Sequence, residues 1–358
     1  MPRAGADADA WTDDAWTDDA VTTAGGVSIP VRRTARRPDW DDLPAEVRRQ
    51  IEDACGERVV AASSAGTGFT PGFASRLRLA DDRRVFVKAA SSADDRRHGW
   101  GLSAAYREEI RKLTLLPAGI GAPALRWSMD REIAGERWVA LGLQYVDGRP
   151  PRRPWRSSEL RLVTDMLARI APLMAQVPAG LELGTFGDDF AGWPDRLGQV
   201  QARDGASAWL AQVAVLAAES VQRCSGSGMT HLDLRDDNLL IDGERNVWIC
   251  DWNWPLRAAP WVDLICVLAS AYGDGLTDEV EAIVESHPLT RDVDRRSIDA
   301  LLANLWLFFT TGMEAPVPAY SPYLRAHQSW YAVATRAWLQ RRLGFSIDSC
   351  ALGRGGGT

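Results

Sequence analysis

His231-Leu232-Asp233-Leu234-Arg235-Asp236-Asp237-Asn238 is the stretch that decides the fold, and Asp251 follows it at the end of an apolar run. Asp233 offers a carboxylate that can accept a proton from a reacting hydroxyl. Asn238 and Asp251 offer oxygen ligands of the kind that Mg²⁺ prefers. A proton acceptor beside two metal ligands is the equipment for moving a phosphoryl group from a nucleotide. The sequence therefore predicts a phosphotransferase centre in this segment.

The residues between the two predicted metal ligands indicate how they come together. Two short apolar runs, 239–241 and 247–250, flank the turn sequence Asp242-Gly243-Glu244. Such a pattern is typical of a β-hairpin. A hairpin would hold Asn238 and Asp251 close together although thirteen positions separate them.

Two charged residues upstream fit the same chemistry. In the run 84–89, alternation places Lys88 on the face of a strand that also carries Phe86. Glu109 stands four residues before Leu113, hence on the packed stripe of a helix, where an unpaired carboxylate would be costly. We therefore expect Lys88 and Glu109 to pair, although a lysine on a strand often faces solvent. Glu108 should project further toward solvent and is the weaker candidate.

The chain divides into two predicted lobes after an N-terminal extension. Residues 1–40 read as a disordered acidic tail followed by an Arg-rich arm. Residues 41–146 form an N-lobe and residues 147–358 a C-lobe. The N-lobe pattern predicts helices over 44–55 and 102–116 and strands over 59–62, 74–80, 84–89 and 138–146. The C-lobe pattern is mainly helical, with helices near 157–176, 205–223, 260–272, 294–314 and 321–343.

At Asp233, Asn238 and Asp251 the chain resembles the small-molecule kinases typified by aminoglycoside and choline phosphotransferases. The resemblance implies an α+β, two-lobed, protein-kinase-like fold with a small antiparallel sheet and one main helix in the N-lobe. It implies transfer of the γ-phosphoryl group of ATP or GTP to a hydroxyl of a small molecule, with Mg²⁺ bound by Asn238 and Asp251. Asp233 would be the catalytic base, and Glu109 would hold the phosphate-binding Lys88.

The resemblance also bears on the residues around this centre. Gln144-Tyr145-Val146 falls where such kinases offer backbone groups to the purine edge. His231 shapes the catalytic loop in the resembled motif, and Asp263 braces it. The turn 66–72 departs by one residue from G-x-G-x-x-G, so either a plain hairpin turn or a phosphate-binding loop fits it. Leu232 and Asp236-Asp237 stand where many relatives have glycine and a Pro-Gly-like pair.

Composition and charge limit the function classes. With 46% apolar and 25% charged residues, the 358-residue chain is an ordinary globular protein. It shows no apolar run of membrane-spanning length and no signal peptide, which predicts a cytoplasmic protein without a membrane partner. Residues 181–290 carry a net charge of −12, which argues against a nucleic-acid partner. Clustered carboxylates would instead favour a cationic, amine-bearing acceptor. The oligomeric state stays open.

Two other functions remain possible from the sequence. A catalytically silent nucleotide-binding or interaction module could keep the same fold, because fold alone does not establish activity. A protein kinase is the second alternative. The segment between Asp251 and Asp263 is too short for an activation segment and lacks D-F-G and A-P-E.

Overall fold

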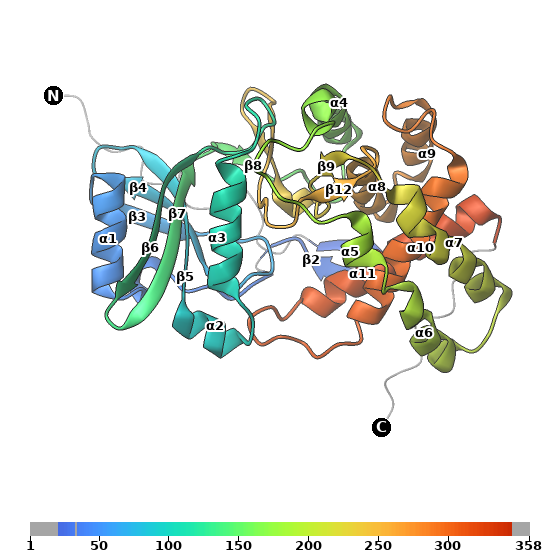
Figure 1. Ribbon diagram of the computed structural model, residues 1–358, viewed down its shortest axis with the longest axis horizontal. Coiled ribbons are helices and arrows are strands. Elements are labelled where there is room, and N and C mark those ends of the chain that lie inside the picture. The colour runs from blue at the N-terminus through green and yellow to red at the C-terminus, as the bar shows by residue number, and fades with distance from the viewer. Residues whose placement is uncertain (1–20, 33, 346–358) are drawn as a thin grey trace.

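The computed structural model describes residues 21–32 and 34–345, and these form two lobes of different composition (Figure 1). The smaller lobe is an antiparallel sheet of five strands in the order β3-β4-β5-β7-β6. The larger lobe is mostly helical. The expected α+β architecture, with a small antiparallel sheet in one lobe and helices in the other, is therefore confirmed. The predicted tail at residues 1–20 lies outside the described residues.

Alternating side chains give the N-lobe sheet two apolar faces. Its strands are β3 (Val59–Ser64), β4 (Phe73–Leu79), β5 (Arg84–Ser91), β6 (Leu125–Ile133) and β7 (Glu136–Gln144). Val85 and Val87 pack toward α1 (Ala45–Cys55), which buries Val47 and Ile51 against them. Phe86 lies on the opposite face, with α3 (Leu102–Leu113). α2 (Ser92–His98) connects β5 to α3. Because successive strand residues point to opposite faces, Lys88 falls on the α3 side with Phe86.

The strand β6 is absent from the sequence-based prediction. It lies at the sheet edge beside β7, paired from Leu125↔Leu143 to Ile133↔Glu136. Asp130, Arg131 and Glu132 are exposed on it, so polar residues interrupt the alternation that would have indicated a strand. Charged side chains on an edge strand also discourage pairing with another chain.

The C-lobe packs long helices around one apolar core. Its elements are β8 (Gly148–Arg149), α4 (Ser157–Met174), α5 (Phe186–Phe190), α6 (Leu197–Asp204), α7 (Ala208–Cys224), β9 (Gly228–Thr230), β10 (Leu239–Asp242), β11 (Val247–Ile249), β12 (Leu256–Ala258), α8 (Val262–Gly273), α9 (Thr277–Ser286), α10 (Arg295–Gly312) and α11 (Leu324–Leu343). The five predicted helices correspond to α4, α7, α8, α10 and α11. No helix in 21–32 or 34–345 is both long and apolar enough to span a membrane.

Residues 21–32 and 34–40, which include the described part of the Arg-rich arm, have a defined structure. β1 (Val21–Ala24) and β2 (Val27–Pro30) form a hairpin around Gly25-Gly26. Ala24 and Ile29 are buried against Trp330 and Tyr331 of α11. The β1–β2 hairpin thus packs on the C-lobe, although it precedes the N-lobe in the sequence (Figure 1).

Candidate active site

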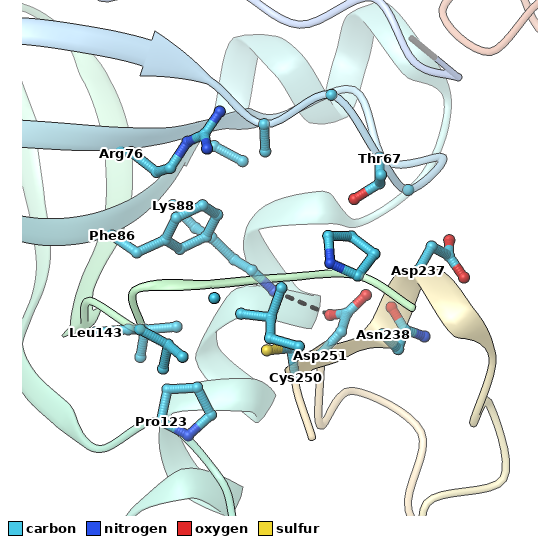
Figure 2. A pocket seen from close by; sticks show the side chains of 18 of the residues that line it. Thr67, Arg76, Phe86, Lys88, Pro123, Leu143, Asp237, Asn238, Cys250 and Asp251 are labelled. Carbon is cyan, nitrogen blue, oxygen red and sulfur yellow. Dashed lines mark hydrogen bonds and ion pairs between the residues drawn. The ribbon is translucent and has the colours of Figure 1, made fainter. Parts of the chain in front are cut away.

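The hairpin expected from the turn sequence is present and brings the two predicted metal ligands together. Leu239 of β10 pairs with Ile249 of β11, so the ends of both strands coincide. The Cys250 N–H donates to the Asn238 carbonyl at 2.8 Å, which closes the base of the hairpin beside Asp251. Asp237, Asn238 and Asp251 consequently lie at one wall of a cleft between the lobes (Figure 2).

Lys88 joins the N-lobe to this hairpin. Its Nζ lies 2.7 and 2.9 Å from the two carboxylate oxygens of Glu109 on α3, and 2.9 Å from Oδ1 of Asp251. Figure 2 shows the lysine side chain directed toward Asp251. The Lys88 side chain is 12% exposed and that of Glu109 only 1%. The predicted Lys–Glu pair is thus formed, and its lysine also contacts the carboxylate expected to bind the metal.

Charge balance favours the ionised forms of Lys88 and Asp251, whereas burial raises the pKa of Glu109. Burial alone would lower the pKa of Lys88, but the carboxylates of Asp251 and Glu109 outweigh it and hold the pKa above its ordinary value. Burial likewise opposes ionisation of Asp251, yet Lys88 and Asn253 lower its pKa to about 2. The side-chain amide of Asn253 donates to Asp251 Oδ1 at 2.6 Å. Sequence reasoning missed Asn253, although its place two residues after Asp251 kept it next to the site.

Asp233 lies in the loop 231–238 but not on the wall of the main cavity. Asn238 Nδ2 donates to its carbonyl at 2.7 Å and to its Oδ2 at 3.1 Å, while Arg235 pairs with its Oδ1. The side chain keeps 30% exposure. Burial by the surrounding loop raises the pKa of Asp233 to about 6, although Arg235 acts in the opposite direction. Asp233 is therefore a carboxylate whose proton affinity suits a general base near neutral pH.

The loop that presents Asp233 contains an unusual backbone conformation. Leu232 has a φ of 66°, a value that glycine adopts readily and that costs other residues about 1 to 3 kcal/mol. The carboxylate of Asp263 accepts hydrogen bonds from the N–H groups of His231 and Leu232, both at 2.8 Å. His231 Nε2 lies 2.9 Å from the Cys250 carbonyl. Asp263 and His231 thus hold the loop in shape, in the bracing roles that the sequence suggested for them.

The cavity between the lobes encloses about 210 Å³. Lys88, Glu109, Asn238 and Asp251 line it, as does the predicted purine-binding segment Gln144-Tyr145-Val146. Apolar side chains complete its walls, among them Phe86, Leu143 and Pro123 (Figure 2). The turn between β3 and β4 forms another side through Gly66, Thr67, Gly68 and Thr70. Arg32 and Arg37 of the N-terminal arm also line it, which the sequence had not indicated.

The acidic residues expected to attract a cationic acceptor are largely engaged elsewhere. The side chain of Asp274 is fully buried and pairs with Arg153. Asp278 pairs with Arg341 and Glu279 with Arg161. Asp188 accepts hydrogen bonds from Thr185 at the start of α5. In the described part of the chain, no basic side chain lies within ion-pair distance of the remaining three, Glu182, Asp189 and Asp195.

Comparisons with known proteins agree with the fold. No family model and no curated protein sequence matches the chain. Solved structures do. A ternary complex of the aminoglycoside phosphotransferase APH(4)-Ia with ADP and hygromycin B superposes with a TM-score of 0.54 at 12% identity, covering 87% of this chain and 100% of that one.

Two further structures are similar to a comparable degree. An aminoglycoside phosphotransferase from Alicyclobacillus acidocaldarius gives a TM-score of 0.53 at 14% identity, over 80% of this chain and 92% of that one. The amicoumacin kinase hAmiN, in complex with AMP-PNP, Ca²⁺ and Ami, gives 0.52 at 10% identity, over 82% and 93%. The chain therefore has the fold of small-molecule phosphotransferases over nearly its whole described length.

Proposed function

We propose that this protein is a small-molecule kinase, which transfers the γ-phosphoryl group of ATP or GTP to a hydroxyl group. The observation that carries the proposal is the position of Lys88. Its ammonium group contacts both Glu109 and Asp251 at the wall of a cavity between two lobes. A strand lysine paired with a helix glutamate beside a metal-binding aspartate is the arrangement that protein kinases use for phosphoryl transfer from a nucleotide. The likeness in fold to phosphotransferases solved with ADP or AMP-PNP supports the same conclusion.

In this proposal each cavity residue has a separate task. Lys88 holds the phosphate chain, and Glu109 keeps the lysine in place. The backbone of Gln144, Tyr145 and Val146 borders the purine. Asp233 orients the acceptor hydroxyl and receives its proton as the bond to phosphorus forms.

The oxygen atoms available at Asn238 and Asp251 fit a magnesium ion. The amide nitrogen of Asn238 is committed to Asp233, which leaves its Oδ1 for a metal. Lys88 and Asn253 both contact Oδ1 of Asp251, which leaves Oδ2. One amide and one carboxylate oxygen suit Mg²⁺, which usually takes its remaining ligands from water and phosphate. When bound, the ion would neutralise negative charge on the phosphate oxygens.

Asp251→Asn is expected to raise the Mg²⁺ concentration needed for half-maximal turnover and to weaken nucleotide binding at the same time. The substitution removes the only full negative charge in the proposed ligand pair. It also removes a counter-ion of Lys88. Titration of activity with Mg²⁺ at fixed nucleotide measures the first effect, and titration with nucleotide at fixed Mg²⁺ measures the second. Asp242→Asn, at the turn of the same hairpin, is the control. An unchanged magnesium titration in Asp251→Asn would place the metal elsewhere.

The dependence of kcat/KM on pH is expected to show an acid limb near pH 6. The base must be ionised, and because burial raises the pKa of Asp233 to about 6, activity is lost as pH falls through that value. Arg235→Gln should move the limb to higher pH, since Arg235 lowers the pKa of Asp233. Histidine does not account for such a limb at His231 or His327, where burial lowers the pKa, at His327 to about 4. A limb near pH 4 in the wild type would contradict the assignment.

We further propose that the acceptor is a hydroxyl compound carrying an amine. Two kinases of this fold were solved with hygromycin B and with Ami. Glu182, Asp189 and Asp195 form no ion pair among the described residues, although Lys112 acts to lower the pKa of Asp189 against the larger effect of burial. Carboxylates that are not neutralised by an ion pair favour a cation over an uncharged sugar. The other four acidic residues, Asp188, Asp274, Asp278 and Glu279, are engaged in ion pairs or a helix cap and contribute little to the attraction of a cation.

A turnover assay tests the function directly. Purified protein is mixed with Mg²⁺ and either ATP or GTP, and each candidate acceptor is checked for gain of one phosphoryl group. The panel contains hydroxylated amines, uncharged sugars and nucleosides, and a generic protein substrate. Transfer to hydroxylated amines is expected. Nucleotide binding without transfer to any acceptor would favour the silent module, and transfer only to the protein substrate would favour a protein kinase.

A further inference from the structure

The described residues of the N-terminal arm, 31, 32 and 34–39, lie between the glycine-containing turn of the N-lobe and the C-lobe. Thr34 is buried, and its hydroxyl donates to the Gly68 carbonyl at 2.5 Å. Its carbonyl accepts a hydrogen bond from the Ser321 hydroxyl at 3.3 Å. The N–H of Arg36 donates to the Tyr320 carbonyl at 2.7 Å. The arm is therefore fixed from both sides, with the β1–β2 hairpin anchoring it on α11.

Because the arm is anchored in this way, the guanidinium of Arg37 lies against the turn between β3 and β4. Its Nε donates to the Thr70 carbonyl at 3.0 Å and its Nη1 to the Ala65 carbonyl at 2.8 Å. A long contact of 3.5 Å joins Nη2 to the Thr70 hydroxyl. A Cβ at Gly68 would lie 2.9 Å from Nη2, so glycine leaves the room that the guanidinium occupies. Arginine has five N–H donors, and two of them remain for a ligand.

Arg37 is a partly buried cation that forms no ion pair with a carboxylate of the described residues. Burial lowers its pKa, while Tyr106 and the more distant carboxylates of Asp251 and Asp237 act to raise it. Within 21–32 and 34–345, no Asp or Glu oxygen forms an ion pair with it. A buried charge without a direct partner is costly, and an arginine in a protein does not lose its proton. Because Arg37 lines the nucleotide cavity, an anion entering that cavity would supply the missing partner.

The turn itself presents an incomplete set of phosphate donors. Its glycines stand at positions 66, 68 and 72, one residue away from the regular phosphate-binding pattern. Pro71 has no N–H to offer. Two carbonyls of the same segment, at Ala65 and Thr70, face the arginine. A cation held at these carbonyls provides hydrogen-bond donors where backbone N–H groups are lacking.

We propose that Arg37 binds the phosphate chain of the nucleotide, so that the N-terminal arm forms part of the phosphate site. The inference rests on the proposed function, because it requires a nucleotide in the cavity between the lobes. It assigns the arm a task in ligand binding in addition to its packing on the C-lobe. Lys88 then contacts the phosphates from the sheet, and Arg37 contacts them from the side of the turn.

The test compares ligands that differ only in phosphate. Calorimetry measures the affinity of wild type, Arg37→Met and Arg37→Lys for the nucleoside, diphosphate and triphosphate of the base that the wild type binds, with Mg²⁺ present. In Arg37→Met the diphosphate and triphosphate should bind about tenfold to hundredfold more weakly, since hydrogen bonds to charged groups are strong. Nucleoside affinity should stay within about twofold of the wild type. The affinity of Arg37→Lys for the diphosphate and triphosphate should fall between that of the wild type and that of Arg37→Met. Arg36→Met, one position away and exposed, is the matched control and should match the wild type.

A second variant separates phosphate binding from support of the turn. Thr34→Val removes the hydrogen bond to Gly68 but keeps the Arg37 cation. Thr34→Val should weaken the binding of nucleoside and the binding of triphosphate by the same factor. An equal loss of nucleoside and triphosphate affinity in Arg37→Met would overturn the inference, as would unchanged triphosphate binding. A wild type that binds no nucleotide would overturn the proposed function as well. If Arg37→Met does not fold, selective loss of phosphate affinity in Arg37→Lys decides.

Discussion

Asp233→Asn lowers kcat by about 10² to 10⁴, the loss typical for removal of a positioned general base, and leaves nucleotide affinity within about threefold. The reason for this separation is geometric. Asp233 is absent from the wall of the cavity that Lys88 and Asp251 line, so the nucleotide does not depend on its charge. Transfer to the acceptor hydroxyl does depend on the charge of Asp233, because only an ionised carboxylate can take the proton of that hydroxyl. Steady-state kinetics and calorimetric nucleotide titration measure the two effects.

Asp237→Asn is the control for this experiment. Both carboxylates pair with Arg235, Asp237 at 2.9 Å, so either substitution releases one partner of the same guanidinium. If the rate loss came only from freeing Arg235, the two variants would be equally slow. If Asp233 is the catalytic base, kcat should fall much less in Asp237→Asn than in Asp233→Asn. Wild-type turnover in Asp233→Asn would remove Asp233 from the role of base.

The central residues could be predicted because their geometry is encoded over short distances. Asp233 and Asn238 belong to one loop, and a tight hairpin carries the chain from Asn238 to Asp251. For Lys88 and Glu109, strand and helix periodicity give the direction of each side chain. Burial then requires the two opposite charges to meet. Local sequence therefore contains nearly all the information for this cluster.

The N-terminal arm could not be placed in this way. Arg37 reaches the cavity because the β1–β2 hairpin packs on α11, and Ile29 and Trp330 are 301 positions apart in sequence. Nothing local indicates that contact. Only the β1–β2 hairpin itself could have been predicted from the sequence, because Gly25-Gly26 between runs rich in β-branched residues is typical of a two-residue turn. The same limit applies to Asp274, whose charge suggested a cationic ligand until its buried pair with Arg153 became visible.

Lys88→Met is expected to destabilise the fold by about 3 to 5 kcal/mol and to abolish nucleotide binding. The substitution leaves Glu109 buried, at 1% side-chain exposure, without the cation that balances it. Removal of one partner from a buried pair typically costs this much, because the remaining charge has no compensation. Urea unfolding measures the free energy. Arg107→Met, which breaks an exposed pair with Asp130, should cost less than about 1 kcal/mol.

The double variant Lys88→Met/Glu109→Leu separates the structural effect from the functional one. Replacing a buried ion pair by apolar side chains of similar volume is often neutral or stabilising. The double variant should therefore regain most of the stability lost in Lys88→Met. Asp251 still lacks its lysine in both variants, and the phosphate chain lacks a cation. Nucleotide binding should consequently remain absent although the fold is restored. Recovery of nucleotide affinity together with stability would show that the pair only supports the N-lobe, and Lys88 would then have no place in phosphate binding.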